Sequence, residues 1–433
     1  MEMVLEFLRD VLSQPALLIG IMSCVGLIAL KRPFHKVMTG TLKPILGYLM
    51  LAAGAGVIVS NLDPLGKMIE HGFHITGVVP NNEAIVAVAQ KVLGVETMSI
   101  LVVGLLMNLC IARFTKFKYV FLTGHHSLFM ACLMSAVLGT AGLSGMELIL
   151  VGGFLMGAWS AISPAIGQSY TSKVTDGDEI AIGHFGSLGY YLSAWVAQYV
   201  GKAEDSTEDI EIPEKWGFLR DSTLSTLSGD MSPYLYAVMS AMNFAVGVTI
   251  VYSGVRMILG DLIPAFQGIA TKIIPNAIPA VDCAVFFTYA PTAVVLGFLS
   301  SFIGGIIGML ILGAVGGVLI IPGLVPHFFC GATAGIYGNA TGGRRGAAVG
   351  AFLNGLAITF LPAMALPVLG QLGFQNTTFG DADFAVMGLV LGNAYEWVGM
   401  AGIYGIVAIA ALVLIIPNFI KTKGKVINYV EED

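Results

Sequence analysis

The most informative residue of this chain is an acidic side chain inside an apolar segment. Asp282 lies in the stretch IPAVDCAVFF, and no basic residue is closer to it in the sequence than Lys272. A charge at the middle of a bilayer costs about 2.5–3.5 kcal/mol or more, so it needs a partner or a function. One interpretation is a carboxylate that faces a water-filled site and accepts hydrogen bonds from substrate hydroxyls. The other is a helix N-cap that follows Pro279.

Two histidines occur in similar apolar surroundings, each next to glycine. His125 lies in FLTGHHSLF and His184 in AIGHFGSLGY. An imidazole can donate and accept hydrogen bonds, which suits a polyol or lactone ligand, and neighbouring glycines let the backbone approach a small ligand closely. The alternative for each is a core histidine bonded to a carbonyl group. His126 points elsewhere on a helix, which favours a structural role.

A weak internal repeat adds a second acidic candidate. Residues 79–94 (VPNNEAIVAVAQKVLG) can be aligned with residues 280–297 (AVDCAVFFTYAPTAVVLG), which makes Glu83 the counterpart of Asp282. Asn82 lies beside Glu83 and belongs to the same candidate site. A repeat of this kind predicts two related halves, with a site near mid-membrane where interrupted segments meet. The alternative for Glu83 is a helix start at the membrane surface.

Other polar residues have less specific interpretations. Asp176 in TDGDE is predicted to lie in a turn at the membrane surface, and His327 is either a site residue or a packing residue. Residues 287–289 (FTY) indicate a helix break that lines a cavity, or plain packing. Arg344 and Arg345 are predicted to anchor the topology, or to dock an acidic cytosolic partner.

The composition predicts a membrane protein that positions these residues on transmembrane helices. Of 433 residues, 56% are hydrophobic and 11% are charged, whereas soluble domains have about 25% charged residues. Because about 20 apolar residues span a bilayer, the chain has room for about ten or eleven helices. We therefore expect one membrane-embedded domain over residues 1–433, all-α and polytopic, with re-entrant or interrupted segments. Among the predicted spans are 42–62, 119–138, 282–302, 325–341 and 347–369.

The charge distribution predicts the orientation. Basic clusters, which favour the cytoplasmic side, occur at residues 31–36, 113–118, 344–345 and 421–425. The N-terminus carries Glu2, Glu6 and Asp10 against Arg9, so we expect it outside, without a cleaved signal peptide. An odd number of spans, eleven by length, then puts the C-terminus in the cytoplasm. Residues 201–232 form an acidic loop, predicted to be solvated, between the halves.

Several kinds of site have no signal in the sequence. The five cysteines all lie in apolar stretches without metal-ligand spacing, which favours small buried residues. No phosphate-binding glycine motif, no nucleophile elbow and no metal-spaced cluster is present. The acidic loop gives no indication of a nucleic-acid partner. We therefore predict no catalytic residue, no metal and no cofactor.

Six segments of the chain resemble one family. They are, in order, GTLKPILGYLMLAAGAG (40–56), FLTGHH (121–126), VTDGDEIAIGH (174–184), GVRMILGDLIPAFQGI (254–269), IPNAIPAVDCAVFFTYAPTAVVLGF (274–298) and VLIIPGLVPHFFCGATAGIYGNATGGRRGA (318–347). This pattern resembles the L-ascorbate permeases of the bacterial phosphotransferase system, which are enzyme IIC components. The resemblance covers nearly the whole chain, and the motif around Asp282 is quite specific.

The resemblance implies an eleven-span homodimer with a substrate-holding core domain and a V-shaped dimerisation domain. It implies that His125 and Asp282 bind substrate, and that cytosolic enzyme IIA and IIB components complete the phosphotransferase complex. This chain differs from the family pattern at Phe129, where glutamine is usual. It differs again at 185–187 (Phe, Gly, Ser), where a glutamine run is usual, and at Ala55, where serine is usual. Phe129 and Ser187 therefore join the candidate site, and each change alters hydrogen bonding near the pocket.

Two functions follow as hypotheses. The first is a phosphotransferase-system permease for L-ascorbate or a related small polyhydroxylated compound, in which a separate enzyme IIB phosphorylates the substrate. Such a chain has no self-contained catalytic site and only positions the substrate. The second is a proton-coupled transporter of a sugar or sugar acid with the same fold, in which Glu83 or Asp282 takes up the proton.

Overall fold

The computed structural model describes residues 14–73, 77–80, 82–209, 272–369 and 377–420, with scattered positions between 239 and 269. The described chain is mostly helical. Six of its helices contain stretches long and apolar enough to cross a membrane, which makes this a multi-pass membrane protein. These stretches are Phe34–Gly54, Val95–Phe114, Gly145–Val174, Pro291–Ala314, Leu324–Leu369 and Met400–Phe419.

The first half of the chain, before residue 210, alternates long helices with very short strands. Its elements are α2 (Pro15–Ala29), α3 (Phe34–Phe73), β1 (Val79–Pro80), α4 (Asn82–Phe114), β2 (Tyr119–Phe121), α5 (Gly124–Thr140), α6 (Gly145–Val174), β3 (Ala181–Ile182), α7 (Ser187–Val200) and the 3-10 turn η1 (Thr207–Asp209). The apolar run predicted to end at Leu62 continues as helix to Phe73. The hydropathy of the sequence indicates where contact with lipid ends. The helix itself continues beyond that point because its backbone hydrogen bonds do not depend on apolar side chains.

The second half, after residue 271, repeats this alternation. Its elements are β4 (Ile278–Val281), the 3-10 helix η3 (Cys283–Thr288), α9 (Pro291–Ala314), α10 (Leu324–Leu369), β5 (Thr377–Thr378), α11 (Ala382–Val398) and α12 (Met400–Phe419). The helix α10 contains both predicted spans 325–341 and 347–369. It breaks between them at Gly342 and Gly343, where Gly343 has a φ of 58° that favours glycine.

The strands form two small parallel sheets in which the two halves interleave. In one, β4 of the second half lies between β2 and β3 of the first half. In the other sheet, β1 of the first half pairs with β5 of the second half. Val78, just before β1, forms a parallel bridge to Ile320 of the second half. Each sheet therefore has a central segment from one half and two outer segments from the other half. The expectation of interrupted segments is met at these strands.

The strands correct two predicted spans. The run 119–138 is not one helix, because Tyr119–Phe121 is a strand and α5 begins at Gly124. The run 282–302 is likewise divided into η3 and α9, which begins at Pro291. Strand residues in these segments are as apolar as helical ones, so composition alone does not separate them.

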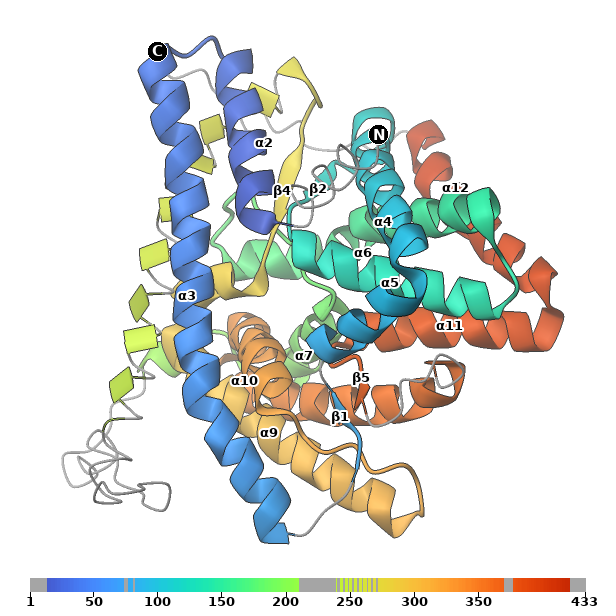
Figure 1. The fold of residues 1–433 in the computed structure, drawn as a ribbon. Helices are drawn as coiled ribbons and strands as arrows, with labels where there is room; N and C mark the ends of the chain where they lie inside the picture. The colour runs from blue at the N-terminus through green and yellow to red at the C-terminus, as the bar shows by residue number, and fades with distance from the viewer. Residues whose placement is uncertain are drawn as a thin grey trace.

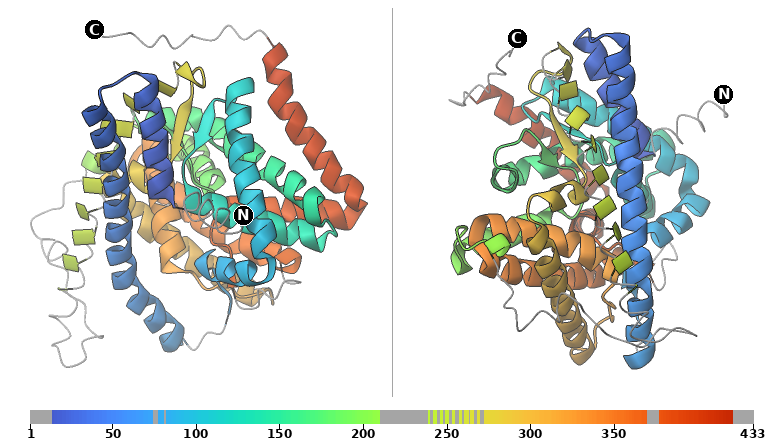
Figure 2. Two further views of the ribbon diagram at one scale, coloured as in Figure 1. Left: turned by 45° about the horizontal axis from the view of Figure 1, so that its top comes forward. Right: turned by 90° about the vertical axis from the view of Figure 1, so that its left-hand side faces the viewer.

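The helices α2 and α3 lie along one side of the molecule, next to the described positions between 239 and 269, while α4–α12 form the rest (Figures 1 and 2). The packing on this side is very close. A Cβ added at Gly47 would lie 2.7 Å from the carbonyl oxygen of Gly254 and 2.9 Å from the amide nitrogen of Ile258. This side of the molecule provides one wall of the site described below.

The start of the acidic loop is exposed at residues 202–205, 208 and 209, as expected for a solvated segment, and it is also hydrogen-bonded to the helices. Glu208 accepts hydrogen bonds from the backbone amides of Thr292 and Ala293 and from the Thr292 hydroxyl, at 2.8–3.3 Å. It thereby caps α9, because the first amides of a helix have no partner within it. Thr207 is buried and its amide donates to Asn339 at 2.9 Å. The rest of the predicted loop, 210–232, lies outside the described residues.

Candidate functional site

The three strands of the first sheet end at the same place. Phe121 of β2 and Ala181 of β3 both pair with Ala280 of β4. Because parallel strands point in one direction, the residues that follow them meet at one edge, which is where open parallel sheets bind ligands. These residues include His125, His184 and Asp282. The fold therefore brings together three of the residues singled out from the sequence.

His125 and Asp282 form a pair at this edge. The Nε2 atom of His125 lies 3.5 Å from a carboxylate oxygen of Asp282, and the two side chains are 33% and 12% exposed. The hydroxyl of Tyr48, on α3, lies 3.2 Å from the Nδ1 atom of His125. With Tyr48 donating to Nδ1, the proton of a neutral imidazole lies on Nε2 and faces the carboxylate. Asp282 precedes η3 but makes no side-chain capping bond, so its carboxylate is directed to the site.

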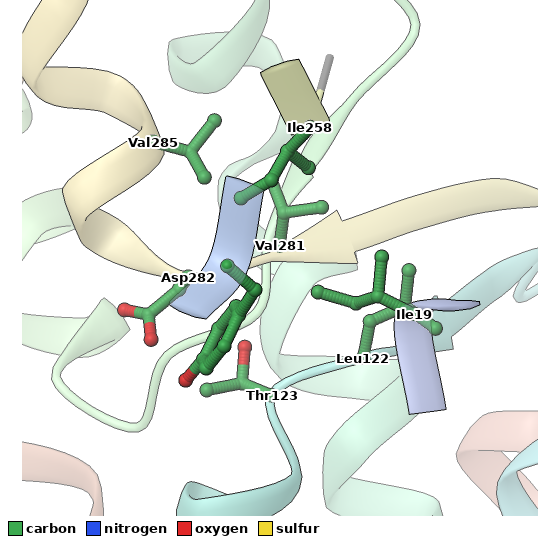
Figure 3. A pocket seen from close by; sticks show the side chains of 8 residues that line it. Ile19, Leu122, Thr123, Ile258, Val281, Asp282 and Val285 are labelled. Carbon is green, nitrogen blue, oxygen red and sulfur yellow. The ribbon is translucent and has the colours of Figure 1, made fainter. Parts of the chain in front are cut away.

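A cavity lies beside this pair. Its wall is formed by Ile19, Tyr48, Leu122, Thr123, Ile258, Val281, Asp282 and Val285. Figure 3 shows Thr123 and Asp282 at one side of the cavity, with Ile19 and Leu122 at the other. The wall combines Ile19, Tyr48 and Ile258, from the side of the molecule that contains α2 and α3, with residues at the strand ends. The wall is mostly apolar with a few polar groups, and the space it encloses holds about one water molecule.

His184 and His126 lie behind the cavity and are buried. The Nδ1 atom of His184 faces two donors, the Gly186 amide at 3.1 Å and the Tyr190 hydroxyl at 2.8 Å. Its ring centre lies 3.8 Å from that of His126, and Nδ1 of His126 accepts from the Phe185 amide at 3.3 Å. The structure thus places both histidines in a packed layer next to the pair His125–Asp282.

At the second sheet, Asn82 and Asp381 lie within hydrogen-bonding distance of each other. Asn82 follows β1 and donates to a carboxylate oxygen of Asp381 at 3.1 Å, while its own oxygen accepts from the Gly380 amide at 2.8 Å. Cys330 donates to the other oxygen of Asp381 at 3.0 Å. Nδ1 of His126 lies 3.8 Å from the oxygen that accepts from Asn82. Asn82 is therefore held by the protein. The side chain of Glu83 lies outside the part of the chain that the structure describes.

Ser187 also bonds to the protein interior. Its hydroxyl donates to Asp383 at 2.8 Å, and the same carboxylate accepts from the Leu188 amide at 2.9 Å and from the Trp159 indole at 3.3 Å. Asp383 thus caps α7 and fixes its first turn, which follows His184. Phe129 packs edge-on against His125, with ring centres 5.7 Å apart, and offers no hydrogen bond.

Three further sequence candidates lie away from the cavity wall. His327 is buried and bonds through Nδ1 to the Ser301 hydroxyl at 2.9 Å. Asp176 is exposed and has a φ of 50°, as a turn residue often has. Arg344 lies 4.0 Å from Asp205, and both side chains are about half exposed.

Four residues of this region were missed in the sequence. Asp381 and Asp383 carried the same signal as Asp282, two acids (GDADF) beside an apolar stretch, and could have been found by the same argument. Tyr48 and Thr123 gave no comparable signal, because a tyrosine and a threonine in a membrane helix or strand end are unremarkable in type. Only the fold shows that they face the cavity.

Two groups of side chains bring metal-type ligand atoms within 4.8 Å of one another. They are His126, His184 and Asp381, and His184, Asp282 and Cys283. Either could offer three ligands to a cation. In both groups, Nδ1 of His184 already accepts protein hydrogen bonds, which leaves only Nε2 of that ring for a ligand.

A helix begins shortly after each of four strands in the two sheets: α4 after β1, α5 after β2, α7 after β3 and α11 after β5. Helix N-termini carry partial positive charge and free amides, which favour electron-rich oxygen atoms. Together with the pair His125–Asp282, they form a polar region inside an apolar helical bundle. Ionisable groups inside a multi-pass membrane protein are typical of transport proteins.

Comparison with known proteins gives the family. The family described as the sugar-specific permease component of the phosphotransferase (PTS) system matches residues 10–383, and the chain belongs to that family. The matched range contains every site residue named above. A relative described as the ascorbate-specific PTS system EIIC component of Mycoplasma pneumoniae is 26% identical, over 90% of this chain and 70% of the relative.

Proposed function

We propose that this chain is the enzyme IIC component that carries L-ascorbate or a closely related small polyhydroxylated compound across the bacterial inner membrane. The observation that carries the proposal is the His125–Asp282 pair at the cavity, at 3.5 Å, in a PTS permease whose relative is described as ascorbate-specific. A carboxylate and an imidazole together can accept from and donate to adjacent hydroxyls of a ligand. His184, Asn82, Ser187 and Phe129 then support the site from behind.

The proposal includes a division of labour. The chain positions the substrate, a cytosolic enzyme IIB phosphorylates it, and enzyme IIA supplies the phosphoryl group. We further propose eleven spans, with the N-terminus outside and the C-terminus in the cytoplasm, and a homodimer. In this arrangement α2, α3 and the described positions between 239 and 269 belong to the V-shaped dimerisation domain. The cavity between them and the strand ends supports such a division.

Two related halves are supported by the interleaved sheets. The Leu122 amide donates to Ala280 as the Ile321 amide donates to Val78, both at 2.9 Å. Matching these bonds makes Ala280 equivalent to Val78, and therefore Asp282 equivalent to Pro80. On this register Glu83 lies three positions beyond the counterpart of Asp282, inside α4. An acidic site group then belongs to one half only.

Uptake of labelled L-ascorbate tests the proposal. Cells would express this chain with ascorbate-type enzymes IIA and IIB, and a matched strain would lack the phosphoryl donor enzyme. We expect phosphorylated ascorbate in the first strain and no uptake in the second. Uptake that persists without the donor and stops with an uncoupler would favour the proton-coupled transporter instead. If the membrane-inserted protein takes up no ascorbate in either strain, the same assay with pentoses, alditols and sugar acids identifies the substrate.

A further inference from the structure

Thr123 is a buried residue with an unusual hydroxyl. It joins β2 to α5, it is 2% exposed, and it holds the N-cap position of α5. A threonine at this position usually accepts a hydrogen bond from an amide of the first helical turn, but Thr123 makes no side-chain capping bond. Within the described part of the chain, its Oγ1 atom has no hydrogen-bond partner.

The Thr123 side chain belongs to the wall of the cavity. It shares this wall with Tyr48 and Asp282, and Figure 3 shows its hydroxyl directed toward the space among these side chains. The adjacent helix turn carries His125, which pairs with Asp282. The unpartnered hydroxyl therefore faces the groups proposed to bind substrate and not a crevice of the core.

We propose that Thr123 is a substrate-binding residue that determines specificity, because its hydroxyl bonds one hydroxyl of the transported compound while Asp282 and His125 bond another. This inference rests on the proposed function and adds a contact to it. The ligand class is a compound with at least two hydroxyls on neighbouring carbons. A site built to bond a hydroxyl rejects an analogue that lacks it, since the buried partner is then left unsatisfied.

The cavity wall shows how substrate reaches this hydroxyl. Ile19, Tyr48 and Ile258 cover the cavity from the side that contains α2 and α3, whereas Leu122, Thr123 and Asp282 belong to the strand ends. Separation of these two sides uncovers Thr123 together with Asp282. No described protein group bonds the Thr123 hydroxyl, and a bound substrate hydroxyl supplies a partner. The residue thus favours the occupied state over the empty one.

Substrate binding by matched variants tests the contact. The full chain in lipid nanodiscs would be titrated calorimetrically with L-ascorbate and with its 5-deoxy and 6-deoxy analogues. We expect Thr123→Val, which keeps the side-chain shape, to weaken L-ascorbate binding about tenfold, and Thr123→Ser to remain within about threefold of the wild type. For one deoxy analogue, the valine variant and the wild type should bind equally, because the ligand already lacks the partner hydroxyl. Equal ascorbate binding by the wild type and the valine variant would overturn the proposal.

The stability of the empty protein separates binding from a structural role. A hydroxyl without a partner contributes nothing to folding, so the melting temperature of Thr123→Val should equal or exceed that of the wild type. A fall of several degrees would show that the hydroxyl has a structural bond and would overturn the inference. Ser163→Ala is the matched control, since its hydroxyl is also buried without a described partner but lies on α6, and its ascorbate affinity should not change.

Failure of the proposed substrate would look different. If the wild type binds no ascorbate, the proposed ligand is wrong, and ribitol, xylitol and arabinitol with their deoxy analogues replace it in the titrations. The same comparison of valine and serine variants then applies to the alditol that binds. The melting temperatures need no ligand, so a destabilised Thr123→Val overturns the role of Thr123 whichever substrate is found.

Discussion

The two small sheets share a parallel strand arrangement, but the residues that follow their strands differ in exposure and in hydrogen bonding. The residues that follow β2 and β4 include His125 and Asp282, whose side chains are 33% and 12% exposed beside a cavity. The residues that follow β1 and β5 include Asn82 and Asp381, which bond to each other, and the Asp381 side chain is only 5% exposed. One set of strand ends borders a cavity, and the other is closed by its own hydrogen bonds.

The comparison shows what separates a binding group from a bracing group in this interior. Both sets lie at parallel strand ends and helix starts, so position in the fold does not distinguish them. The bracing carboxylates have protein donors for their oxygens, as Asp383 does with three. Buried polar groups are normally satisfied in this way, so an incompletely satisfied group at a cavity indicates a ligand site. Four substitutions test this distinction.

The largest effect is expected at the bracing carboxylate Asp383. Asp383→Ala leaves the Leu188 amide, the Ser187 hydroxyl and the Trp159 indole without their acceptor, and should lower the free energy of unfolding by about 3 kcal/mol. Unfolding in mixed micelles measures this loss. Ser187→Ala removes one of the three bonds and should cost about 1 kcal/mol. An Asp383→Ala protein as stable as the wild type would contradict the bracing role.

The binding carboxylate should behave in the opposite way. Asp282→Asn removes the charge that faces His125, and we expect uptake to fall about 100-fold because hydrogen bonds to a charged group are the stronger kind. The melting temperature should change little, since the side chain makes no capping bond. Asp176→Asn, in an exposed turn, is the control and should transport normally. Strong destabilisation by Asp282→Asn would remove the contrast between the two sheets.

A smaller effect is expected across the cavity. Tyr48→Phe removes the hydroxyl that lies 3.2 Å from Nδ1 of His125, so the imidazole loses a partner that fixes its orientation. We expect uptake to fall about fivefold, the equivalent of one hydrogen bond of about 1 kcal/mol. Initial uptake rates over a range of substrate concentrations measure this. Tyr199→Phe, at a tyrosine that is 71% exposed, should have no effect, and an unchanged Tyr48→Phe would exclude Tyr48 from the site.

The smallest effect should come from a brace outside both sheets. Glu208 caps α9, the helix that follows β4 and η3. Glu208→Gln keeps one accepting oxygen but loses the charge at the helix N-terminus, so we expect a loss of about 0.5–1 kcal/mol in unfolding free energy. Glu204→Gln, also exposed, is the control and should have the wild-type stability. A loss of uptake without a loss of stability would mean that Glu208 acts in transport directly.

Much of the architecture could be predicted from the sequence, because lipid demands apolar helices and makes charges rare. This logic correctly gave a helical multi-pass membrane protein, and the motif around Asp282 gave the family. The segment 119–138 shows where it stopped. Tyr119–Phe121 is as apolar as the helix after it, and no hydropathy average separates three strand residues from a helix start.

The site was predictable in part for a similar reason. Single polar residues such as His125 and Asp282 stand out in an apolar sequence, but their partners depend on contacts between distant segments. The function of Asn82 could not be read locally, since its partner Asp381 is 299 residues away. The interruption of α10 was predictable, because the expected spans 325–341 and 347–369 leave a gap where the structure has its break at Gly342 and Gly343.

The interleaved strands have a consequence for how the protein is made. The segment β1 leaves the ribosome nearly 300 residues before β5, with Asn82 and Asp381 separated by 299 positions, which is about 15–60 s of bacterial synthesis. During that interval its backbone groups cannot find their partners, and lipid offers none. The first half must therefore wait, sheltered by the insertion machinery or near the aqueous boundary. A chain truncated before Thr377 never completes this sheet, so the backbone groups of β1 that pair with β5 keep no partner.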